Sequence, residues 1–382
     1  RLNASKNGFS DLWVMDWNTF FADMPDFRLE RSKKHQLVDI LVIALCALLS
    51  GADDFEEIEA YGQRKEAFLR TFLALPNGIP SHDTFTRVFR HMDTEAFGRC
   101  LYNWSAQVLA TVAESLQQVS VDGKVLRGTA RAGAKKSGIC IVSAWSSAHC
   151  LVLGQAKVGS KSNEKTAIPE LLRSLDLTDT LVSCDAAGCQ RANAELIVAR
   201  GGHYLLALKR DQPTIYEQVH DYFSPRLAQL EVAQHLDFGS GRLERRTCRV
   251  ETRLELLDAL ADWPGVRSVI RVDASREIAG RRVEQTRYYV SSLVAEAAEF
   301  NHYIRQHWSI ENRLHWHLDV VFREDRQRVR TQNGPLNMAT ARKMALQALG
   351  RMDDKQSRKN RRKIAGWDDD YLKAVLTKIA PN

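Results

Sequence analysis

The sequence has 382 residues, of which 44% are hydrophobic and 26% are charged, so the chain can bury a sizeable core and form two or three domains. Lys and Arg number 54 against 47 Asp and Glu, and this net charge of +7 favours a polyanionic partner. The longest apolar run, residues 40–49, is shorter than the roughly 18 to 20 residues that cross a bilayer, so we expect no membrane segment. We expect no secretory signal either.

Residues 34–115 have the pattern of a helical domain that follows an N-terminal extension, residues 1–33. HQLVDILVIALCALL is apolar almost all round and amphipathic segments follow it, which indicates a helical bundle. In PNGIPSHDTFTRVFRHM, Pro and Gly end one element, and Ser81 is the predicted N-cap of a helix from about 82 to 92. A short turn before such a helix resembles a helix-turn-helix, and the ordinary alternative is a solvated amphipathic helix.

From about residue 116 short β runs alternate with turns. LQQVSVDG, ICIVSAW and LVLGQAKV are predicted strands, and a helix follows at EKTAIPELLRSL. A strand TLVSCDA, a helix from about 187 to 199, a strand HYLLALK and a helix near Thr214 complete the series. The order βββαβαβα is that of the ribonuclease H-like fold, an α/β fold in which helices flank a mixed sheet. We expect residues 116–350 to form this core, with a β-rich insertion at about 213–287.

Residues 307–325, HWSIENRLHWHLDVVFRED, are predicted to form one helix that carries an unusual number of His, Trp and acidic side chains. His307, Glu311 and His315 lie on one stripe, but positions i and i+8 are about 12 Å apart along a helix, too far to share one ion. Apolar residues beside this stripe would pack on the sheet. Glu324 and Asp325 stand among arginines, which predicts surface ion pairs.

Asp122 and Asp185 each follow a predicted strand directly. Asp-Gly is a common turn pair and an Asp before a helix is a common N-cap, so each residue has an ordinary alternative role. The carboxyl ends of the first and fourth strands meet in space if these strands are neighbours, as they are in the ribonuclease H order. Carboxylates held together repel each other and are tolerated where a divalent cation neutralises them. With Glu311 as a third ligand, the predicted site suits Mg²⁺ or Mn²⁺ better than zinc.

The chain ends in a basic stretch, residues 351–382. Six of the nine residues from Lys355 to Lys363 are basic and none is acidic. Such a run is usually a solvated or disordered surface, and on a DNA-handling protein it would contact phosphates.

These motifs together resemble the DDE transposases of bacterial insertion sequences, specifically the H-repeat-associated, ISAs-type group. The likeness covers the chain from about residue 34 to its end and rests on HQLVDILVIALCALLSGADDFEEIEAYG, LPNGIPSHDTFTRVF, VSVDGKVLRG, LVSCDAAGCQ, ALKRDQPT, YYVSSL, HWSIENRLHWHLDVVFRED and RRKIAGWDDDYLKAVL. The resemblance implies that Asp122, Asp185 and Glu311 are the catalytic triad and the ligands of two Mg²⁺ or Mn²⁺ ions, in agreement with the strand-end argument.

The wider group of related transposases tends to place Tyr, Arg and Lys around the glutamate, at positions held here by Ile304, His307 and Leu318. Asp211 stands where Asn is commoner. We expect DNA contacts from a set of polar and basic side chains, namely His82, Thr84, Arg87, Arg90, Lys124, Arg127, Lys209, Gln212, Arg305, His307, His315, Arg361 and Arg362.

The expected function is cleavage at transposon ends followed by strand transfer into target DNA. The expected partners are the terminal inverted repeats, target DNA and a second copy of the chain in a homodimer, with no membrane. The alternatives are a domesticated DNA-binding relative that does not transpose, or a plain Mg²⁺-dependent nuclease. Seven cysteines without a C-x-x-C pair favour buried reduced thiols over disulfides or zinc, and hence the cytoplasm, at the bacterial nucleoid.

Overall fold

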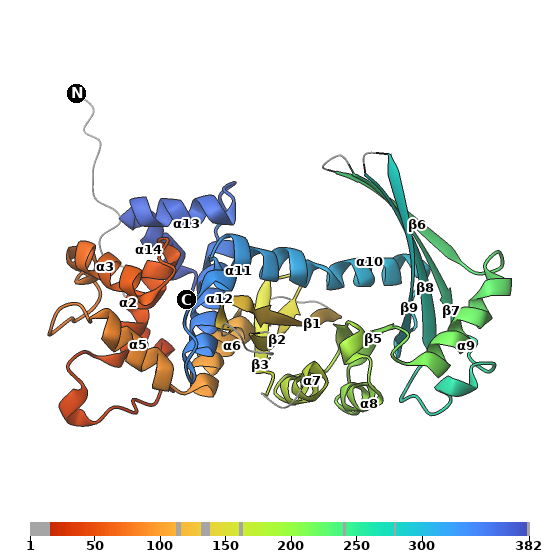
Figure 1. The fold of residues 1–382 in the computed structure, drawn as a ribbon, viewed down its shortest axis with the longest axis horizontal. Coiled ribbons are helices and arrows are strands. Elements are labelled where there is room, and N and C mark those ends of the chain that lie inside the picture. Colours follow the sequence, from red (N-terminus) through yellow and green to blue (C-terminus); the bar gives the residue numbers. More distant parts are fainter. Residues whose placement is uncertain are drawn as a thin grey trace. The chain divides into compact units, whose positions relative to one another are not determined.

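The computed structural model describes residues 16–111, 116–130, 138–159, 163–239, 242–278 and 280–379 (Figure 1). Residues 1–15, part of the expected N-terminal extension, lie outside this range. The chain divides into two compact units. The first comprises residues 1–108 and 318–382, and the second comprises residues 109–317.

The first unit contains helices alone among its described residues. Its helices are α1 (Trp17–Phe20), α2 (Leu37–Leu49), α3 (Phe55–Arg64), α4 (Glu66–Leu69), α5 (His82–His91), α6 (Thr94–Ala110, which ends just inside the second unit), α12 (Gly334–Gly350), α13 (Arg358–Trp367) and α14 (Asp369–Thr377). Helix α2 is buried along nearly its whole length and packs against α12 and α3, which explains why its sequence is apolar all round. The basic stretch near the C-terminus is helical and forms α13.

The predicted helix after Ser81 is confirmed as α5. Ser81 is its N-cap residue, but its hydroxyl makes no capping hydrogen bond and instead lies 3.3 Å from the Thr84 hydroxyl. Phe85, Val88 and Phe89 form the buried face of this helix. The opposite side carries its polar residues.

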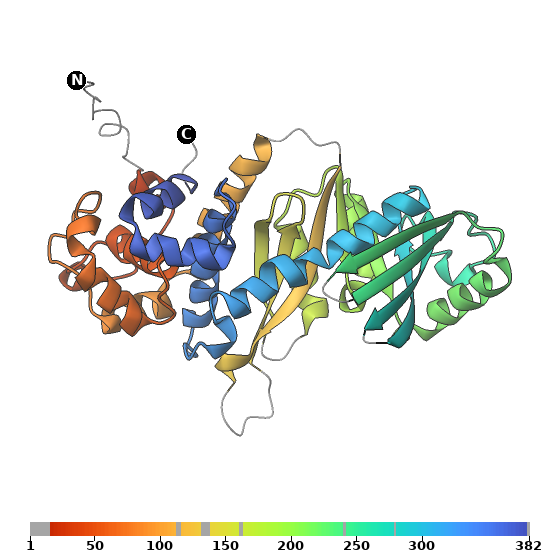
Figure 2. The same ribbon diagram turned by 90° about the horizontal axis from the view of Figure 1, so that it is seen from above.

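The second unit is built on a mixed sheet of nine strands in the order β3-β2-β1-β4-β5-β9-β8-β7-β6 (Figure 2). The first five strands are β1 (Gln117–Leu126), β2 (Ile139–Ser146), β3 (Leu151–Lys157), β4 (Thr180–Cys184) and β5 (His203–Leu208), with α7 (Glu164–Arg173) and α8 (Arg191–Ala199) between them. Strands β1, β4 and β5 run parallel, and β2 runs antiparallel to both β1 and β3. The predicted order of strands and helices is confirmed, and the first and fourth strands are neighbours as expected.

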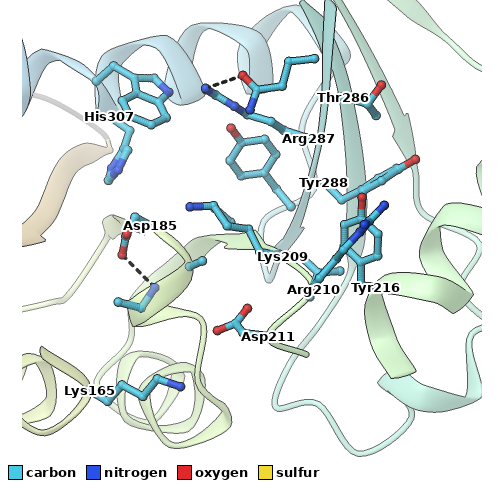
Figure 3. A pocket seen from close by; sticks show the side chains of 17 residues that line it. Lys165, Asp185, Lys209, Arg210, Asp211, Tyr216, Thr286, Arg287, Tyr288 and His307 are labelled. Atoms are coloured by element: carbon cyan, nitrogen blue, oxygen red, sulfur yellow. Dashed lines mark hydrogen bonds between the residues drawn. The ribbon is translucent and has the colours of Figure 1, made fainter. Parts of the chain in front are cut away.

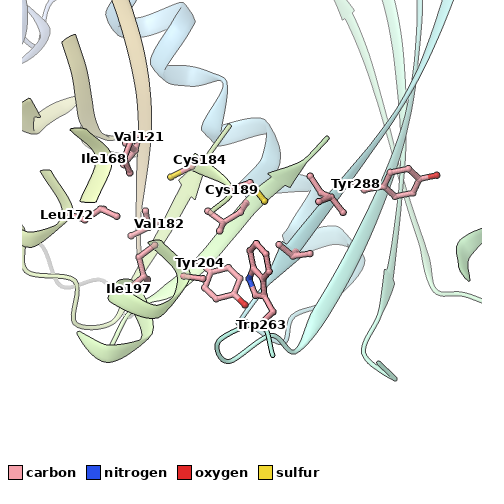
Figure 4. Close-up of a cluster of buried hydrophobic side chains, with 14 of the residues drawn as sticks. Val121, Ile168, Leu172, Val182, Cys184, Cys189, Ile197, Tyr204, Trp263 and Tyr288 are labelled. Atoms are coloured by element: carbon pink, nitrogen blue, oxygen red, sulfur yellow. The ribbon is translucent and has the colours of Figure 1, made fainter. Parts of the chain in front are cut away.

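Successive side chains of β1 and β4 point alternately to the two faces of this sheet. Val121 and Val182 enter a core with α7 and α8, on one face (Figure 4). Leu181 enters a second core with Phe300 of α10 (Ala297–His307), which crosses the other face (Figure 2). Side chains on one strand alternate between faces, so residue parity decides which helix each side chain meets.

The β-rich region continues the same sheet. Helix α9 (Pro213–Phe223) is followed by β6 (Val232–Gly239), β7 (Arg242–Glu251), β8 (Ser268–Ile278) and β9 (Arg281–Ser291), all paired antiparallel. Strand β9 also pairs with β5, so the long hairpins extend the central sheet directly. Backbone pairing therefore continues without interruption from the first five strands to the hairpins.

The prediction of one helix over residues 307–325 is confirmed only in part, because helical residues continue through a π-helical segment and stop at Val320. Helix α10 ends at His307, a π-helical segment spans Ile310–His315, and α11 ends at Val320. Arg323 then has a φ of 50°, in the left-handed region that stops a helix of L-residues. Buried apolar residues continue on both sides of the break, and sequence periodicity does not reveal an extra residue in one turn.

All seven cysteines are free thiols and five of them are buried, as expected. None of the described helices combines the length and the apolar character needed to cross a lipid bilayer.

Candidate active site

Strand parity places Asp122 and Asp185 on the same face of the sheet. Val121 and Cys184 are paired across β1 and β4, and both side chains lie in the core with α7 and α8. The prediction that Asp122 directly follows its strand is wrong, because β1 continues to Leu126 and Asp122 pairs with Ser143 of β2 inside it. Asp122, within β1, and Asp185, directly after β4, must point the other way, toward α10. The two carboxylates therefore emerge at the same level of neighbouring parallel strands.

The surroundings of Asp122 are strongly acidic. Burial, and next the negative charge of Asp185, raise the pKa of its carboxyl to about 7 from an ordinary 3.8. The charge of Glu311 raises this pKa further, whereas a hydrogen bond from the Gly123 amide lowers it. The three predicted acids thus share one electrostatic environment. Asp185 also accepts a hydrogen bond of 2.9 Å from the Ala187 amide, so the N-cap role foreseen as an alternative is present as well.

Helix α10 is fixed to the sheet by a row of polar contacts on the same face. The Gln118 amide donates to the Tyr303 carbonyl at 2.8 Å, and the Ser147 hydroxyl donates to the Gln306 carbonyl at 3.1 Å. The His307 Nδ1 lies 3.1 Å from the Ser183 hydroxyl. Burial lowers the pKa of His307 to about 4, so its imidazole is neutral at neutral pH. His307 therefore contacts the sheet through Ser183 and adds no positive charge to this face.

The π-helical segment carries Glu311 and His315, and it brings both toward Asp122 of β1. The Trp145 indole donates to the Ser309 hydroxyl at 3.3 Å, which holds the start of this segment against β2. The His315 Nδ1 lies 3.5 Å from a carboxylate oxygen of Asp122. Ile310 and Leu314 are fully buried, whereas Glu311 is exposed, so this acid faces solvent instead of packing on the sheet edge.

The donor set suits a hard divalent cation. Three carboxylates repel one another, and this repulsion adds to burial, the larger cause, in raising the pKa of Asp122. Oxygen ligands of this kind bind Mg²⁺ or Mn²⁺. No group of three His, Cys, Asp or Glu side chains lies close enough to hold a metal ion in the part of the chain that the structure describes. The acids therefore match the ion in kind but are not drawn together into a closed coordination shell.

A fourth acid, Glu164, was missed by the sequence reasoning. Its carboxylate lies against the backbone of Gly123, where an added Cβ would clash with its Oε1. The Cys140 thiol donates to the same oxygen at 3.3 Å. The charge of Glu164 is one of the causes that raise the pKa of Asp122. Its position in the first turn of a predicted helix gave no signal, because acids are common there.

A cavity of about 740 Å³ opens beside Asp185 (Figure 3). It lies between the ends of β5 and α10 and the strand β9, and Lys209 extends across it toward Asp185 and His307 (Figure 3). Basic side chains outnumber acids in its lining, and several aromatic rings line it. Of the predicted DNA contacts, this cavity includes Lys209 and His307.

Two stacked pairs in this cavity were also not predicted. The Arg287 guanidinium lies over the Trp308 ring, 4.7 Å from its centroid, and its Nη2 donates to Gln285 at 2.9 Å. The Arg210 guanidinium lies 5.7 Å from the Tyr216 centroid. No local sequence motif marks Arg287, since β9 reaches β5 only through the pairing of distant strands.

The remaining predicted contacts of the second unit have different surroundings. Lys124 is half-buried and Arg127 is exposed on or just after β1. The Gln212 amide donates to the Cys189 carbonyl, so this side chain joins the loops that follow β4 and β5. Arg305 pairs with Asp237 of β6 and approaches His235.

In the first unit, Thr84 and Arg87 lie on one side of α5 and line a second cavity. His82 contacts Glu59 at 2.7 Å, and Arg90 donates to Gln332 at 2.7 Å. Two arginines of the basic stretch near the C-terminus, Arg361 and Arg362, were predicted to contact DNA but are buried. Arg361 binds Asp354 and the Leu349 carbonyl, and Arg362 binds Asp53 and the carbonyls of Leu48, Ala52 and Val321.

The prediction that Glu324 forms surface ion pairs is wrong. Glu324 is only 1% exposed and belongs to the first unit. Its charge partly offsets the lowering, by burial, of the pKa of the enclosed Arg342 guanidinium. Glu324 is thus a structural acid of the helical unit.

Comparison with known families gives two matches. The family described as "Transposase DDE domain" matches residues 114–347, which contain Asp122, Asp185 and Glu311. The family described as "DDE_Tnp_1-associated" matches residues 18–105.

Known relatives cover most of the chain. "H repeat-associated putative transposase YhhI" of Escherichia coli K12 is 35% identical over 92% of this chain and 95% of its own length. "Putative transposase YncI" of Escherichia coli O157:H7 is 34% identical over 94% and 93%. An uncharacterized protein of the dhlA 3′ region of Xanthobacter autotrophicus is 39% identical over 72% and 94%.

Among solved structures, an S-adenosylmethionine-dependent methyltransferase of Clostridium acetobutylicum aligns with 37% of this chain and 50% of its own, at 9% identity and a TM-score of 0.13, and carries no argument. The "Transposase DDE domain" match and the identity to relatives both cover the part of the chain that contains the three acids. The chain belongs to the DDE transposases of bacterial insertion sequences, in the H-repeat-associated group.

Proposed function

We propose that this protein cleaves DNA at the ends of its insertion sequence and joins the freed 3′-OH to target DNA, with Asp122, Asp185 and Glu311 as the catalytic acids. The observation that carries the proposal is the electrostatic coupling of these residues. Asp122 and Asp185 emerge side by side from parallel strands, and the charges of Asp185 and Glu311 both raise the pKa of Asp122. A protein gains nothing in stability from gathering such acids, so their grouping favours a catalytic role.

The proposed core is ribonuclease H-like. The order β3-β2-β1-β4-β5, with β2 antiparallel to its neighbours and β1, β4 and β5 parallel, supports this assignment. The hairpins of β6 to β9 extend the sheet beyond this core. In this arrangement Asp122 lies within β1, Asp185 lies at the carboxyl end of the neighbouring strand β4, and Glu311 lies on the π-helical segment.

Two Mg²⁺ or Mn²⁺ ions would be held by Asp122, Asp185 and Glu311. Bound there, they would activate the attacking oxygen and stabilise the leaving oxygen of an in-line displacement. Asp122 must lose its proton to bind a cation, and its raised pKa makes this binding dependent on pH. His315, 3.5 Å from Asp122, is placed to orient that carboxylate.

The DNA strand that is cut is proposed to bind in the cavity beside Asp185. Lys209, Arg210 and Arg287 line it and supply charge for phosphates, and the Trp308 ring supplies an apolar surface for a sugar or base. His307 is neutral and hydrogen-bonded, so its proposed role is to hold α10 beside this cavity.

The test is nicking of a duplex that carries the terminal inverted repeat, taken from the DNA flanking the gene. The wild-type protein should cut at the repeat end in Mg²⁺ or Mn²⁺ and leave a 3′-OH. Asp185→Asn should bind the same duplex with wild-type affinity and leave it uncut. Cutting by this variant at the wild-type rate would refute the assignment of the acids.

End cleavage also requires that two ends be brought together, so a homodimer on DNA is part of the proposal. Sedimentation of the protein with and without the terminal duplex measures this assembly. The expected result with the duplex is a complex of two chains and two DNA ends. A complex of one chain on one cut end would argue for a simple nuclease.

A further inference from the structure

A second cavity, of about 660 Å³, lies in the helical unit beside α5. Its walls come from α5 and from two loops, near residues 27–35 and 77–81. Three of its lining residues are Lys or Arg, two are His, and none is Asp or Glu. A cavity with this lining favours an anionic ligand.

The polar residues of α5 fall into two groups. Thr84, Arg87 and His91 lie on one stripe of the helix and line the cavity. His82 and Arg90 lie more than about 100° around the helix from Thr84 and are bonded to Glu59 and Gln332. The side of α5 that carries available groups is therefore the wall of a cavity.

Two of the three cations in the lining are available to a ligand. The Arg28 guanidinium is committed to Asp26, at 2.8 Å, and to the His35 carbonyl, at 2.9 Å. Lys34 and Arg87 have no hydrogen bond or ion pair from their charged groups among residues 16–111 or elsewhere in the described chain. The Asn77 amide donates to the Lys34 carbonyl at 2.5 Å, which fixes the backbone that presents this lysine.

An aromatic pair stands beside these cations. Phe27 is 43% exposed, which is unusual for a phenylalanine, and its ring centroid lies 6.0 Å from that of His91. Exposed rings beside basic side chains stack with bases in proteins that bind single nucleic-acid strands. The cavity therefore offers a basic site for the phosphate of a nucleotide and an aromatic site for its base.

We propose that this cavity binds a nucleotide of the insertion-sequence end, with its phosphate at Lys34 and Arg87 and its base against Phe27 and His91. The inference rests on the proposed function and adds where the helical unit grips DNA. A free nucleotide has the same chemistry as a nucleotide within a strand, so the experiment separates the two.

The experiment measures affinity for the terminal-repeat duplex over a series of salt concentrations. Lys34→Gln and Arg87→Gln should each weaken binding about tenfold and lower the slope of log K against log salt by about one. Phe27→Ala should weaken binding of a terminal-repeat duplex that carries one unpaired end nucleotide, with an unchanged slope, because it removes stacking on an unpaired base and no charge. The matched controls Lys33→Gln, whose ammonium pairs with Glu30, and Arg64→Gln, an exposed arginine of α3, should stay within about twofold of the wild type. Arg87→Lys should restore the slope, which excludes a folding defect.

The second measurement is the rise in the melting temperature of the protein with dAMP and with inorganic phosphate. If Arg87→Gln abolishes this stabilisation and leaves duplex affinity unchanged, the cavity is a free-nucleotide site and the DNA assignment is overturned. If Arg90→Gln is as damaging to duplex binding as Arg87→Gln, an open helix surface binds DNA and the cavity does not. Either result leaves the proposed function standing, since metal-dependent nicking by the wild type is measured separately.

Discussion

Asp122 is the residue at which the demands of stability and of function conflict most clearly. Its side chain is 18% exposed, and it lies close enough to Asp185, Glu311 and Glu164 for each charge to raise its pKa. An uncharged residue at this position would remove the repulsion. The cost of keeping Asp122 is understandable only if a cation or a reaction requires its carboxylate.

Asp122→Asn should therefore stabilise the metal-free protein at high pH. The folded-state pKa of about 7 lies above the ordinary 3.8, so folded wild type holds a proton that the unfolded chain loses between about pH 4 and pH 7. Wild-type stability falls as pH rises through this window, and the variant lacks that loss. The free energy of unfolding of the variant, relative to wild type, should rise by on the order of 1 to 3 kcal/mol between pH 4 and pH 8. Urea unfolding in EDTA measures this difference, and parallel pH profiles would contradict it.

Glu311→Gln tests the acid on the π-helical segment. Glu311 is exposed and the substitution is nearly isosteric, so folding and binding to the terminal duplex should be unchanged while nicking and strand transfer fall by more than about a hundredfold. Glu170→Gln, an exposed acid of α7, is the matched control and should nick like the wild type. His315→Ala should reduce nicking without abolishing it. Near-normal nicking by Glu311→Gln would remove Glu311 from the triad.

At the scale of elements, the π-helical segment decides where Glu311 lies. A π turn inserts one residue into a helix and changes the direction of the side chains that follow. The segment is held by apolar anchors, Ile310 and Leu314, and by the bond between Trp145 and Ser309. Helix α10 before it is fixed to β1 and β4 by the polar row under Tyr303 and His307. The Glu311 side chain is thus exposed, while the backbone that carries it is anchored on both sides.

Removing the anchor at Ser309 should impair catalysis more than stability. Ser309→Ala deletes one hydrogen bond and should cost about 1 kcal/mol of unfolding free energy. It should lower the nicking rate several-fold at saturating DNA, because the start of the π-helical segment is no longer tied to β2. Ser174→Ala, which removes a hydroxyl bond at the end of α7, is a control of equal chemistry. Equal nicking rates for the two variants would show that the anchor has no catalytic role.

At the scale of the whole molecule, each compact unit carries a different part of the proposed function. The helical unit holds the cavity with Lys34 and Arg87, and the sheet unit holds the acids and the cavity beside Asp185. The first unit is assembled from both ends of the chain, which α2 and α12 bring together in its core. Binding of DNA ends and chemistry at those ends should therefore be separable.

Removal of the divalent metal by a chelator should separate DNA binding from DNA cleavage. EDTA should abolish nicking while terminal-duplex affinity changes by less than about threefold, because the cations of the helical unit do not depend on a metal. Addition of Mn²⁺ should restore nicking and raise the melting temperature of wild type but not of an Asp122→Asn, Asp185→Asn double variant. A metal-dependent rise in the melting temperature of that double variant would place the ion elsewhere.

The sequence alone determined the order of strands and helices, the helix after Ser81, and the position of Asp185 at a strand end, because these follow from local periodicity and turn chemistry. It placed Asp122 at a strand end as well, but β1 continues past it, because pairing with β2 extends the strand through the Asp-Gly pair. The neighbouring positions of β1 and β4 followed from the recognised element order. Tertiary structure decided the rest. Glu164 and Arg287 reach the site only because distant elements fold together. Arg361 and Arg362 are buried by helix packing. The π-helical segment within residues 307–325 depends on contacts with β1 and β2. Periodicity reports which face of an element is buried, but the partner that buries it is fixed only by the complete fold.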